Sequence, residues 1–224
     1  MRHPRTVTVS LEGFHAVKHV LRFAPELVDS VTVRSRAAAA ELCAALAPDV
    51  AEGLLTLAVE GATDHPTGVA GRARRPPADR QVLTRRGSPL VVLDDPRHPG
   101  NVGAVIRVAA AAGAAGVAVC GPLNPWGASV VRGSAGLHYA LPVVSTQEHE
   151  VDGPVVVLSD EGRPWSSLPA GCALVVGSER AGVSPAWRAR ADEVVALPMR
   201  EGVSSLNLAT AVAAALYAWR LALP

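Results

Sequence analysis

Short apolar runs alternate with helical stretches along the second half of the chain. Runs of Val and Leu without interleaved polar residues are typical of parallel strands that are buried on both faces. Strands that alternate with helices indicate an α/β domain, so we expect a mostly parallel sheet flanked by helices. The pattern predicts strands at residues 90–94, 116–120, 154–159, 173–177 and 194–198, and helices at residues 102–112 and 205–221.

The first part of the chain predicts a smaller α/β module. Helical periodicity and short apolar runs alternate there as well. The expected elements are helices at residues 13–23 and 36–46 and strands at residues 31–33 and 54–59.

A weakly hydrophobic stretch follows this module. Pro76, Pro77 and Gly87 bracket it, and clusters of proline and glycine are typical of connections between domains. We therefore expect a small domain over residues 1–80, a linker over residues 81–88 and a larger domain over residues 89–224.

Composition is that of a soluble globular protein. With 224 residues, 49% of them hydrophobic, the chain can bury a core. Asn207, Thr210 and Arg220 interrupt the longest apolar stretch before it reaches the roughly 20 apolar residues that a membrane span needs. Residues 1–4 lead into polar residues without the apolar region of a signal peptide. We expect a cytoplasmic protein without a membrane partner.

The cysteines and histidines do not form a metal-binding pattern. Cys43, Cys120 and Cys172 are scattered among small apolar residues, which favours reduced, buried thiols over disulfides. His15 and His19 stand four residues apart on a predicted helix, but no further ligand completes the set. We therefore expect no metal.

Basic residues are unevenly distributed, although the net charge is only +1. Residues 1–88 carry twelve Lys and Arg against nine Asp and Glu, whereas the remainder carries nine against eleven. Six of these arginines lie in GRARRPPADRQVLTRRG, residues 71–87. Such a run is often only a solvated linker, but guanidinium groups match phosphate geometry. The run therefore indicates a polyanionic partner.

The segment DDPRHPGNVGAVIRV joins a predicted strand to a predicted helix. Asn101 lies in the first turn of this helix, and Arg107 follows six residues later among Val and Ala. From the residues alone, an ion pair of Arg107 with Asp94 or Asp95 is the simpler explanation of this arginine.

Two more predicted strands end in small or polar residues. LVVGSERAGVSP ends a strand in Gly177 and Glu179, and glycine at a strand end lets a ligand approach the backbone. LPMREGVSSLN places Ser204, Ser205 and Asn207 before the last helix. Helix capping is a sufficient reason for one such residue. Because the carboxyl ends of parallel strands meet at one crevice, the three segments together predict a ligand site there.

These segments resemble the ordered motifs of the SpoU (TrmH) family, RNA ribose 2′-O-methyltransferases of the SPOUT class that use S-adenosylmethionine. PRHPGNVGAVIRVAAAAGAAGV, VVGSERAGVSP and LPMREGVSSLNLATAVAAALY carry the resemblance, which covers essentially all of residues 89–224. VVRGSAGLHYALPV resembles the segment between the first two motifs. LEGFHAVKHVL and HPTGVAGRARRP resemble the start and end of the family's small substrate-binding domain. In this chain Pro66 and Thr67 separate His65 from Gly68, where many relatives have a single Gln.

The resemblance implies a trefoil knot in the larger domain and a homodimer. Composition would not suggest a knot, because knots are nearly absent from proteins. The last helix is apolar nearly all round, which agrees with burial on several sides. Its apolar positions are Leu206, Leu208, Val212, Leu216, Trp219 and Leu223.

The resemblance also implies a cofactor, a substrate and site residues. The cofactor is S-adenosylmethionine, and the substrate is structured RNA, either ribosomal or transfer RNA. The catalytic residues, matched to the family motifs, are Arg107, Asn101, Glu179, Ser205 and Asn207. The cofactor-binding residues are Gly177, Leu197, Leu206, Met199 and Gly182. The RNA-binding residues are Arg72, Arg74, Arg75, Arg85, Arg86 and Arg132.

Methyl transfer from a sulfonium is an in-line displacement, so we expect catalysis to depend on positioning the ribose 2′-hydroxyl and removing its proton. Arg107 is the family's central residue, but a guanidinium is not ordinarily deprotonated in a protein. We therefore expect it to hold a phosphate and stabilise the developing alkoxide. Asn101, Ser205 and Asn207 would orient Arg107 and the ribose, and Glu179 would order the cofactor loop or Arg107.

Three other interpretations stay open. The first is an RNA-binding protein of the same fold without catalysis, and the second is a methyltransferase that acts on something other than RNA. The third is a nucleotide-dependent oxidoreductase, which is disfavoured because Gly100 and Gly103 lack the G-x-G-x-x-G spacing that this class needs.

Overall fold

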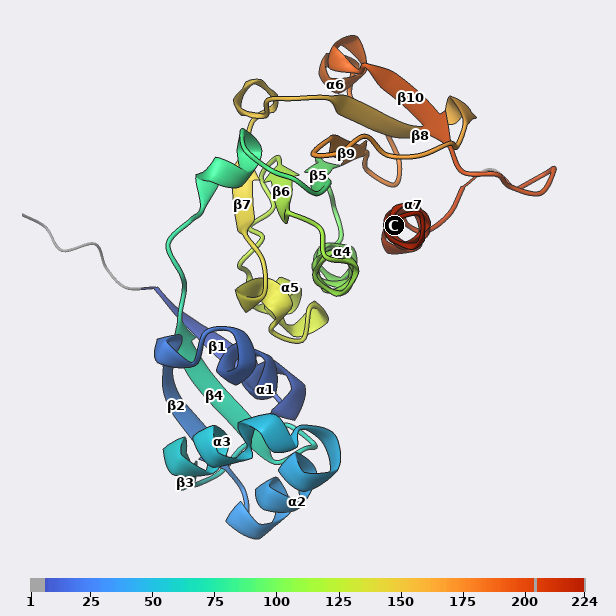
Figure 1. Ribbon diagram of the computed structural model, residues 1–224. Coiled ribbons are helices and arrows are strands. Elements are labelled where there is room, and N and C mark those ends of the chain that lie inside the picture. Colours follow the sequence, from blue (N-terminus) through green and yellow to red (C-terminus); the bar gives the residue numbers. More distant parts are fainter. Residues whose placement is uncertain (1–6, 204, 224) are drawn as a thin grey trace, which may run out of the picture. The chain divides into compact units, whose positions relative to one another are not determined.

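A computed structural model describes residues 7–203 and 205–223. Ser204, one of the polar residues predicted to lie at the ligand site, and the opening residues 1–6 are outside the described residues. The chain forms two compact units (Figure 1). The first contains residues 1–77 and 134–140, and the second contains residues 78–133 and 141–224.

The first unit contains a four-stranded sheet with strand order β1-β4-β2-β3. Strand β4 is antiparallel to both β1 and β2, whereas β2 and β3 are parallel. In chain order the elements are β1 (Thr8–Glu12), α1 (Phe14–Phe23), η1 (Pro25–Leu27), β2 (Val28–Val33), α2 (Arg36–Leu46), η2 (Pro48–Val50), α3 (Ala51–Leu57), β3 (Ala58–Glu60), β4 (Val69–Arg74) and η4 (Leu137–Tyr139).

One face of this sheet is buried and the other is exposed. Leu11, Gly71 and Val31 are paired across β1, β4 and β2, and all three are buried. A side chain at Gly71 would lie 3.2 Å from Val17, which shows how closely α1 packs on this face. Arg72, the next residue of β4, is exposed on the opposite face.

The sequence patterns of the first unit predicted its helices better than its strands. Helix α2 has the predicted bounds, but the predicted strand at residues 54–59 is wrong, because α3 extends to Leu57 and β3 contains only Ala58–Glu60. A short apolar run does not distinguish a strand from a buried helical turn. Strand β4 was missed within the arginine-rich run, where small inward-facing residues alternate with exposed arginines.

The second unit contains a six-stranded sheet with strand order β10-β8-β9-β5-β6-β7. Every strand pair in it is parallel, which confirms the predicted mostly parallel sheet. In chain order the elements are η3 (Arg80–Leu83), β5 (Leu90–Asp94), α4 (Pro99–Ala112), β6 (Gly116–Cys120), α5 (Ala128–Gly133), β7 (Val143–Thr146), η5 (Glu148–Glu150), β8 (Val155–Pro164), β9 (Ala173–Val176), α6 (Pro185–Arg190), β10 (Glu193–Ala196) and α7 (Leu208–Leu221).

Helices α4, α5 and α7 form a close-packed layer in the second unit. A side chain at Gly103 of α4 would lie 2.6 Å from the carbonyl oxygen of Val130 in α5, so glycine permits this close approach. Helices α4 and α7 lie side by side (Figure 1). Leu208, Val212, Leu216 and Trp219 of α7 are buried in the single chain, whereas Leu206 and Leu223, just outside the helix, are 42% and 43% exposed. Burial of these flanking residues by a partner subunit stays a prediction.

The residues predicted as a linker are partly packed into the second unit. Val82 and Leu83 are buried in its core. The Arg86 guanidinium donates hydrogen bonds to the carbonyl oxygens of Leu83 and Asp152, at 2.7 Å and 2.5 Å. This arginine therefore joins two segments of the same unit.

The three cysteines are buried and unpaired, as predicted. Burial raises the pKa of the Cys120 thiol to about 12 and that of the Cys172 thiol to about 11, so both stay protonated at neutral pH. Within residues 7–203 and 205–223, no three His, Cys, Asp or Glu side chains are grouped so that they could hold a metal. In the same described part, no helix has the length and apolar character needed to cross a bilayer.

Candidate functional site

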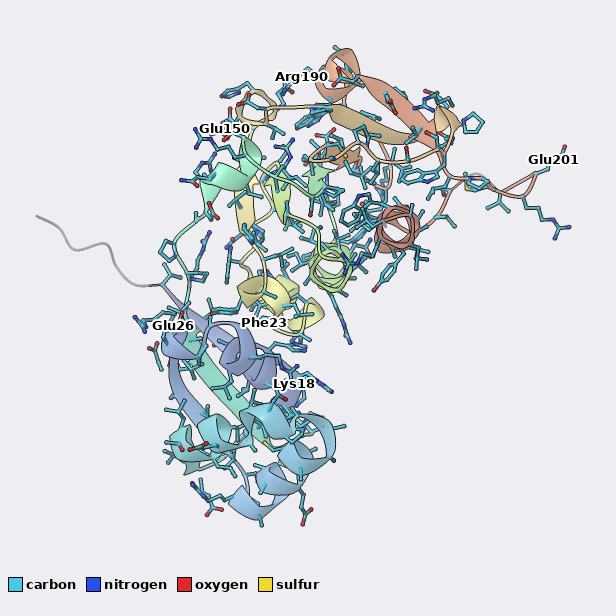
Figure 2. All side chains as sticks on the ribbon, in the orientation of Figure 1. Lys18, Phe23, Glu26, Glu150, Arg190 and Glu201 are labelled. Atoms are coloured by element: carbon cyan, nitrogen blue, oxygen red, sulfur yellow. The ribbon has the colours of Figure 1, made fainter. Side chains whose placement is uncertain are left out.

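A cavity of about 430 Å³ lies where strand β9 ends, beside the middle of β8. The two strands are parallel neighbours, and their pairing ends at Leu158 and Val176, next to the cavity. The cavity is lined by this last pair and the residues that follow it, by Arg188 of α6 and by the start of α7. Residues near the two ends of the loop between β10 and α7 also line it. Figure 2 shows Glu201 at the far tip of that loop, away from these ends.

The loop after β9 folds back on itself. Ser178 and Gly182 exchange two backbone hydrogen bonds, of 3.1 Å and 3.0 Å. A Cβ atom at Gly177 would lie 2.0 Å from the carbonyl carbon of Gly182, so only glycine leaves room for the returning chain. Gly182 itself has a φ of 66°, a left-handed conformation that favours glycine. Both glycines therefore shape the cavity wall.

Hydrogen bonds connect the three segments that the sequence predicted to converge. The Asn101 side-chain amide donates to the Glu179 carboxylate at 2.5 Å. The Asn207 amide donates to the Asn101 side-chain oxygen at 3.2 Å, while its own oxygen caps α7 by accepting from the backbone amide of Ala209 at 2.9 Å. The cap and the site contact therefore use different atoms of one side chain.

The Glu179 carboxyl group is held in its ionised form. Burial by itself would raise its pKa. The hydrogen bond from Asn101, backbone hydrogen bonds and the nearby His98 outweigh burial and lower the pKa below its ordinary value. Glu179 is therefore a charged hydrogen-bond acceptor at neutral pH rather than a proton donor.

Arg107 is exposed on α4, and it has no hydrogen-bond or ion-pair partner among the residues that the structure describes. The two candidate partners are engaged elsewhere, since Asp94 accepts from the Ser184 amide at 2.7 Å and Asp95 pairs with Arg97. The ion-pair explanation is therefore wrong. Arg107 lies about 9 Å along the helix axis from Asn101 and does not line the cavity.

Most of the other predicted site residues lie together. All five predicted cofactor-binding residues line the cavity, and so do three of the predicted catalytic residues. These residues are Gly177, Gly182, Leu197, Met199 and Leu206, together with Glu179, Ser205 and Asn207.

Strand β8 and helix α6 also contribute to the cavity, which the sequence patterns did not predict. Leu158, Ser159 and Asp160 line it from β8, and Arg188 lines it from α6. The Arg188 guanidinium donates to the Val183 carbonyl oxygen at 3.2 Å and so supports the loop after β9. The polar residues that follow the predicted strand at residues 154–159 were the available signal, because they form another polar strand end.

The predicted RNA-binding arginines differ in their surroundings. Arg74 pairs with Asp29 at 3.2 Å, and Arg86 is engaged with backbone carbonyls as described above. The structure therefore gives Arg86 a packing role, and its assignment to RNA binding stays a prediction. Arg72 and Arg85 are exposed, and the described residues provide no partner for either guanidinium.

The two remaining predicted RNA-binding arginines lie in different units. Arg75 follows β4 and is partly buried, and burial lowers the pKa of its guanidinium. Arg132 is exposed on α5.

The fold and the site define an α/β protein with a cavity of ligand size at the edge of its parallel sheet and an amide and carboxylate cluster beside it. A model of the SpoU rRNA Methylase family matches residues 88–217, so the chain belongs to this family. The family resemblance is thus confirmed. The trefoil knot that it implies stays a prediction.

Known proteins resemble the chain over most of its length. It is 32% identical over 191 residues to a 23S rRNA (uridine(2479)-2′-O)-methyltransferase of Streptomyces viridochromogenes, a match that covers 77% of the chain and 65% of that enzyme. It is 27% identical over 230 residues to the 23S rRNA (guanosine(2553)-2′-O)-methyltransferase RlmP of Bacillus subtilis, covering 95% of the chain and 88% of RlmP. The solved structure of the SpoU methyltransferase AviRb from Streptomyces viridochromogenes with AdoMet has a TM-score of 0.76 and 26% identity, covering 94% of the chain and 88% of AviRb.

Proposed function

We propose that this chain transfers a methyl group from S-adenosylmethionine to a ribose 2′-hydroxyl of ribosomal RNA in the cytoplasm. The observation that carries the proposal is the hydrogen-bonded connection from Glu179 through Asn101 to Asn207, which joins the three family motifs beside one cavity. The 23S rRNA 2′-O-methyltransferases among the relatives and the AdoMet complex of AviRb support it.

The cavity has the size and chemistry for this cofactor. Small-molecule pockets have volumes of about 300–1,000 Å³, and this one has about 430 Å³. Apolar side chains such as Leu197, Leu206 and Leu208 line it and would pack against an adenine ring. The carboxylates of Asp160 and Glu179 also line it and favour a positively charged sulfonium over an anionic nucleotide.

The exposed guanidinium of Arg107 has a separate task. During transfer, the ribose oxygen forms a bond to the methyl carbon, the carbon–sulfur bond breaks, and the hydroxyl proton leaves to solvent. Negative charge develops on the oxygen, and a fixed positive group stabilises it. Arg107 would supply that group and hold the neighbouring phosphate, while Asn101 and Asn207 orient the ribose.

A labelled-methyl assay tests the proposal. Radiolabelled S-adenosylmethionine, ribosomal RNA and the protein should give labelled RNA, and mapping should locate the label on a single ribose. A transcript with 2′-deoxyribose at that position should accept no label. Cofactor binding without transfer to any RNA would favour the silent RNA-binding alternative, and label on a base or a protein would contradict the proposal.

We also propose that the chain forms a homodimer through α7. Tyr217 and Leu221 lie one turn apart on this helix and are 43% and 83% exposed in the single chain, so they place two large apolar side chains next to each other on its exposed face. Leu221→Glu should reduce the mass measured by sedimentation from that of a dimer to that of a monomer. Leu46→Glu introduces the same charge at a leucine of α2 that is 51% exposed, and it should leave the mass unchanged. A monomeric parent protein would contradict the proposal.

Two exposed arginines are proposed to contact the RNA backbone. Arg72→Gln and Arg85→Gln should each weaken RNA binding and lower the slope of log K against log salt concentration by about one, because each removes one phosphate contact. Arg22→Gln is the matched control, since this arginine forms an ion pair with Asp49 at 2.6 Å. Filter-binding titrations over a range of salt concentrations measure the slopes. Parent-like slopes in both test variants would contradict this placement of the RNA.

A further inference from the structure

The cavity contains a carboxylate that the three family motifs do not include. Asp160 belongs to β8 and is exposed where it lines the cavity. Strand β8 last pairs with β9 at Leu158 and Val176. Its pairing with β10 is interrupted after Val157 and resumes at Arg163, so Asp160 lies in an irregular stretch of β8. Asp160 therefore lies beyond the carboxyl end of β9, where the chain of β9 turns away and leaves space for a ligand.

Neighbouring groups leave most of this carboxylate available. One Asp160 oxygen accepts a hydrogen bond from the Ser159 hydroxyl at 3.4 Å, and no cation pairs with Asp160 within the described ranges. Arg188, the arginine that lines the same cavity, is engaged by the Glu161 carboxylate at 2.8 Å and by the Val183 carbonyl oxygen. An ionised carboxylate offers about four acceptor positions. Asp160 thus keeps acceptor capacity that faces the cavity.

The chemistry of a carboxylate restricts what it can recognise in a nucleoside cofactor. It accepts hydrogen bonds and donates none, so it does not suit the ring nitrogens of adenine or a carboxylate. Two adjacent oxygens match two adjacent hydroxyl donors, and acidic residues bind the ribose of dinucleotides in this way in other α/β folds. The other cavity carboxylate, Glu179, is already engaged by Asn101.

We propose that Asp160 is a specificity-determining residue that accepts hydrogen bonds from the vicinal ribose hydroxyls of the cofactor. The inference rests on the proposed function, because it assumes that the cavity holds S-adenosylmethionine. Asp160 selects a ribonucleoside over a deoxyribonucleoside, and its negative charge disfavours adenine nucleotides that carry phosphates in place of the sulfonium.

A cycle of protein variants and ligand analogues tests this role. S-adenosylhomocysteine, its 2′,3′-dideoxy analogue and its N6-methyl analogue are titrated calorimetrically into the parent protein and Asp160→Asn. Loss of the hydroxyls should weaken binding to the parent at least about tenfold, and Asp160→Asn should weaken binding of the ribose ligand by a similar factor. The dideoxy analogue should bind both proteins equally, within about twofold. Asp152→Asn is the control, because it makes the same change at an exposed aspartate of the same unit that does not line the cavity.

The outcomes separate this inference from the proposed function. If the parent binds S-adenosylhomocysteine but Asp160→Asn weakens ribose and dideoxy ligands equally, the inference is wrong and the proposed cofactor stands. If Asp160→Asn weakens binding of S-adenosylhomocysteine but leaves the affinity for the N6-methyl analogue unchanged, Asp160 contacts the adenine amine. That result would overturn the inference as well. A parent protein that binds neither S-adenosylhomocysteine nor S-adenosylmethionine would refute the proposed function itself. If Asp160→Asn folds poorly, the parent protein still tests the contribution of the hydroxyls, because its affinities for S-adenosylhomocysteine and for the dideoxy analogue can be compared.

Discussion

Arg107→Ala is expected to slow methyl transfer at least about a hundredfold while changing cofactor affinity less than about twofold. Removing one group that stabilises a developing oxyanion typically costs two to three orders of magnitude in rate. Cofactor affinity should survive, because Arg107 does not line the cavity. Its guanidinium has no partner among residues 7–203 and 205–223, so the substitution breaks no internal contact there and should not destabilise the protein.

Single-turnover methylation and cofactor titration measure the two effects separately. Arg107→Lys retains the charge without the planar fork and should recover part of the rate, because an ammonium also stabilises an oxyanion. Arg97→Ala is the matched control, since Arg97 is exposed near the site but pairs with Asp95. A parent rate in Arg107→Ala would refute the catalytic assignment. An equal loss of transfer rate in Arg97→Ala would show that the reaction needs only positive charge near the site.

The parallel sheet of the second unit was predictable because its strands are apolar throughout. All residues of β5 and β6 are buried, and such runs occur where helices cover both faces. Strand β7 and the short helices α5 and α6 were not predicted. Helices α5 and α6 are too short to show a clear periodicity, and tertiary packing determines them. The two-residue alternation of β4 was hidden because its exposed positions are arginines, which suggested a solvated linker.

The site was predictable to the extent that parallel strands end at one edge. That rule and the family motifs together indicated residues that do lie around one cavity, such as Gly177, Leu197 and Asn207. They did not reveal which side chains bond to one another. Asn101 and Asn207 are 106 positions apart in sequence, and only the fold brings their amides to 3.2 Å. Asp160 was missed because β8 extends beyond its apolar run, through an irregular polar stretch, before it pairs with β10 again at Arg163.

Gly177→Ala is expected to abolish measurable cofactor binding. Its Cβ would lie 2.0 Å from the carbonyl carbon of Gly182 and 2.2 Å from the backbone nitrogen of Val183. These are backbone atoms, which cannot move aside as a flexible side chain would, so the loop after β9 must open. Opening breaks the paired hydrogen bonds between Ser178 and Gly182 and displaces Glu179 from Asn101. We expect affinity for S-adenosylhomocysteine to fall more than about a hundredfold, and stability to fall by about 1–3 kcal/mol.

Calorimetric titration and chemical denaturation measure these two losses. Gly87→Ala is the matched control, because among the described residues, apart from its chain neighbours, no heavy atom lies within 4 Å of the position of its added methyl group. A destabilised Gly177→Ala protein that still binds the cofactor normally would mean that the loop opens without disturbing the ligand, and the cavity would then not be the cofactor site. Loss of binding with most of the stability retained is the result that ties the cofactor to this loop, since the strands beneath it, β8 and β9, pair independently of the turn.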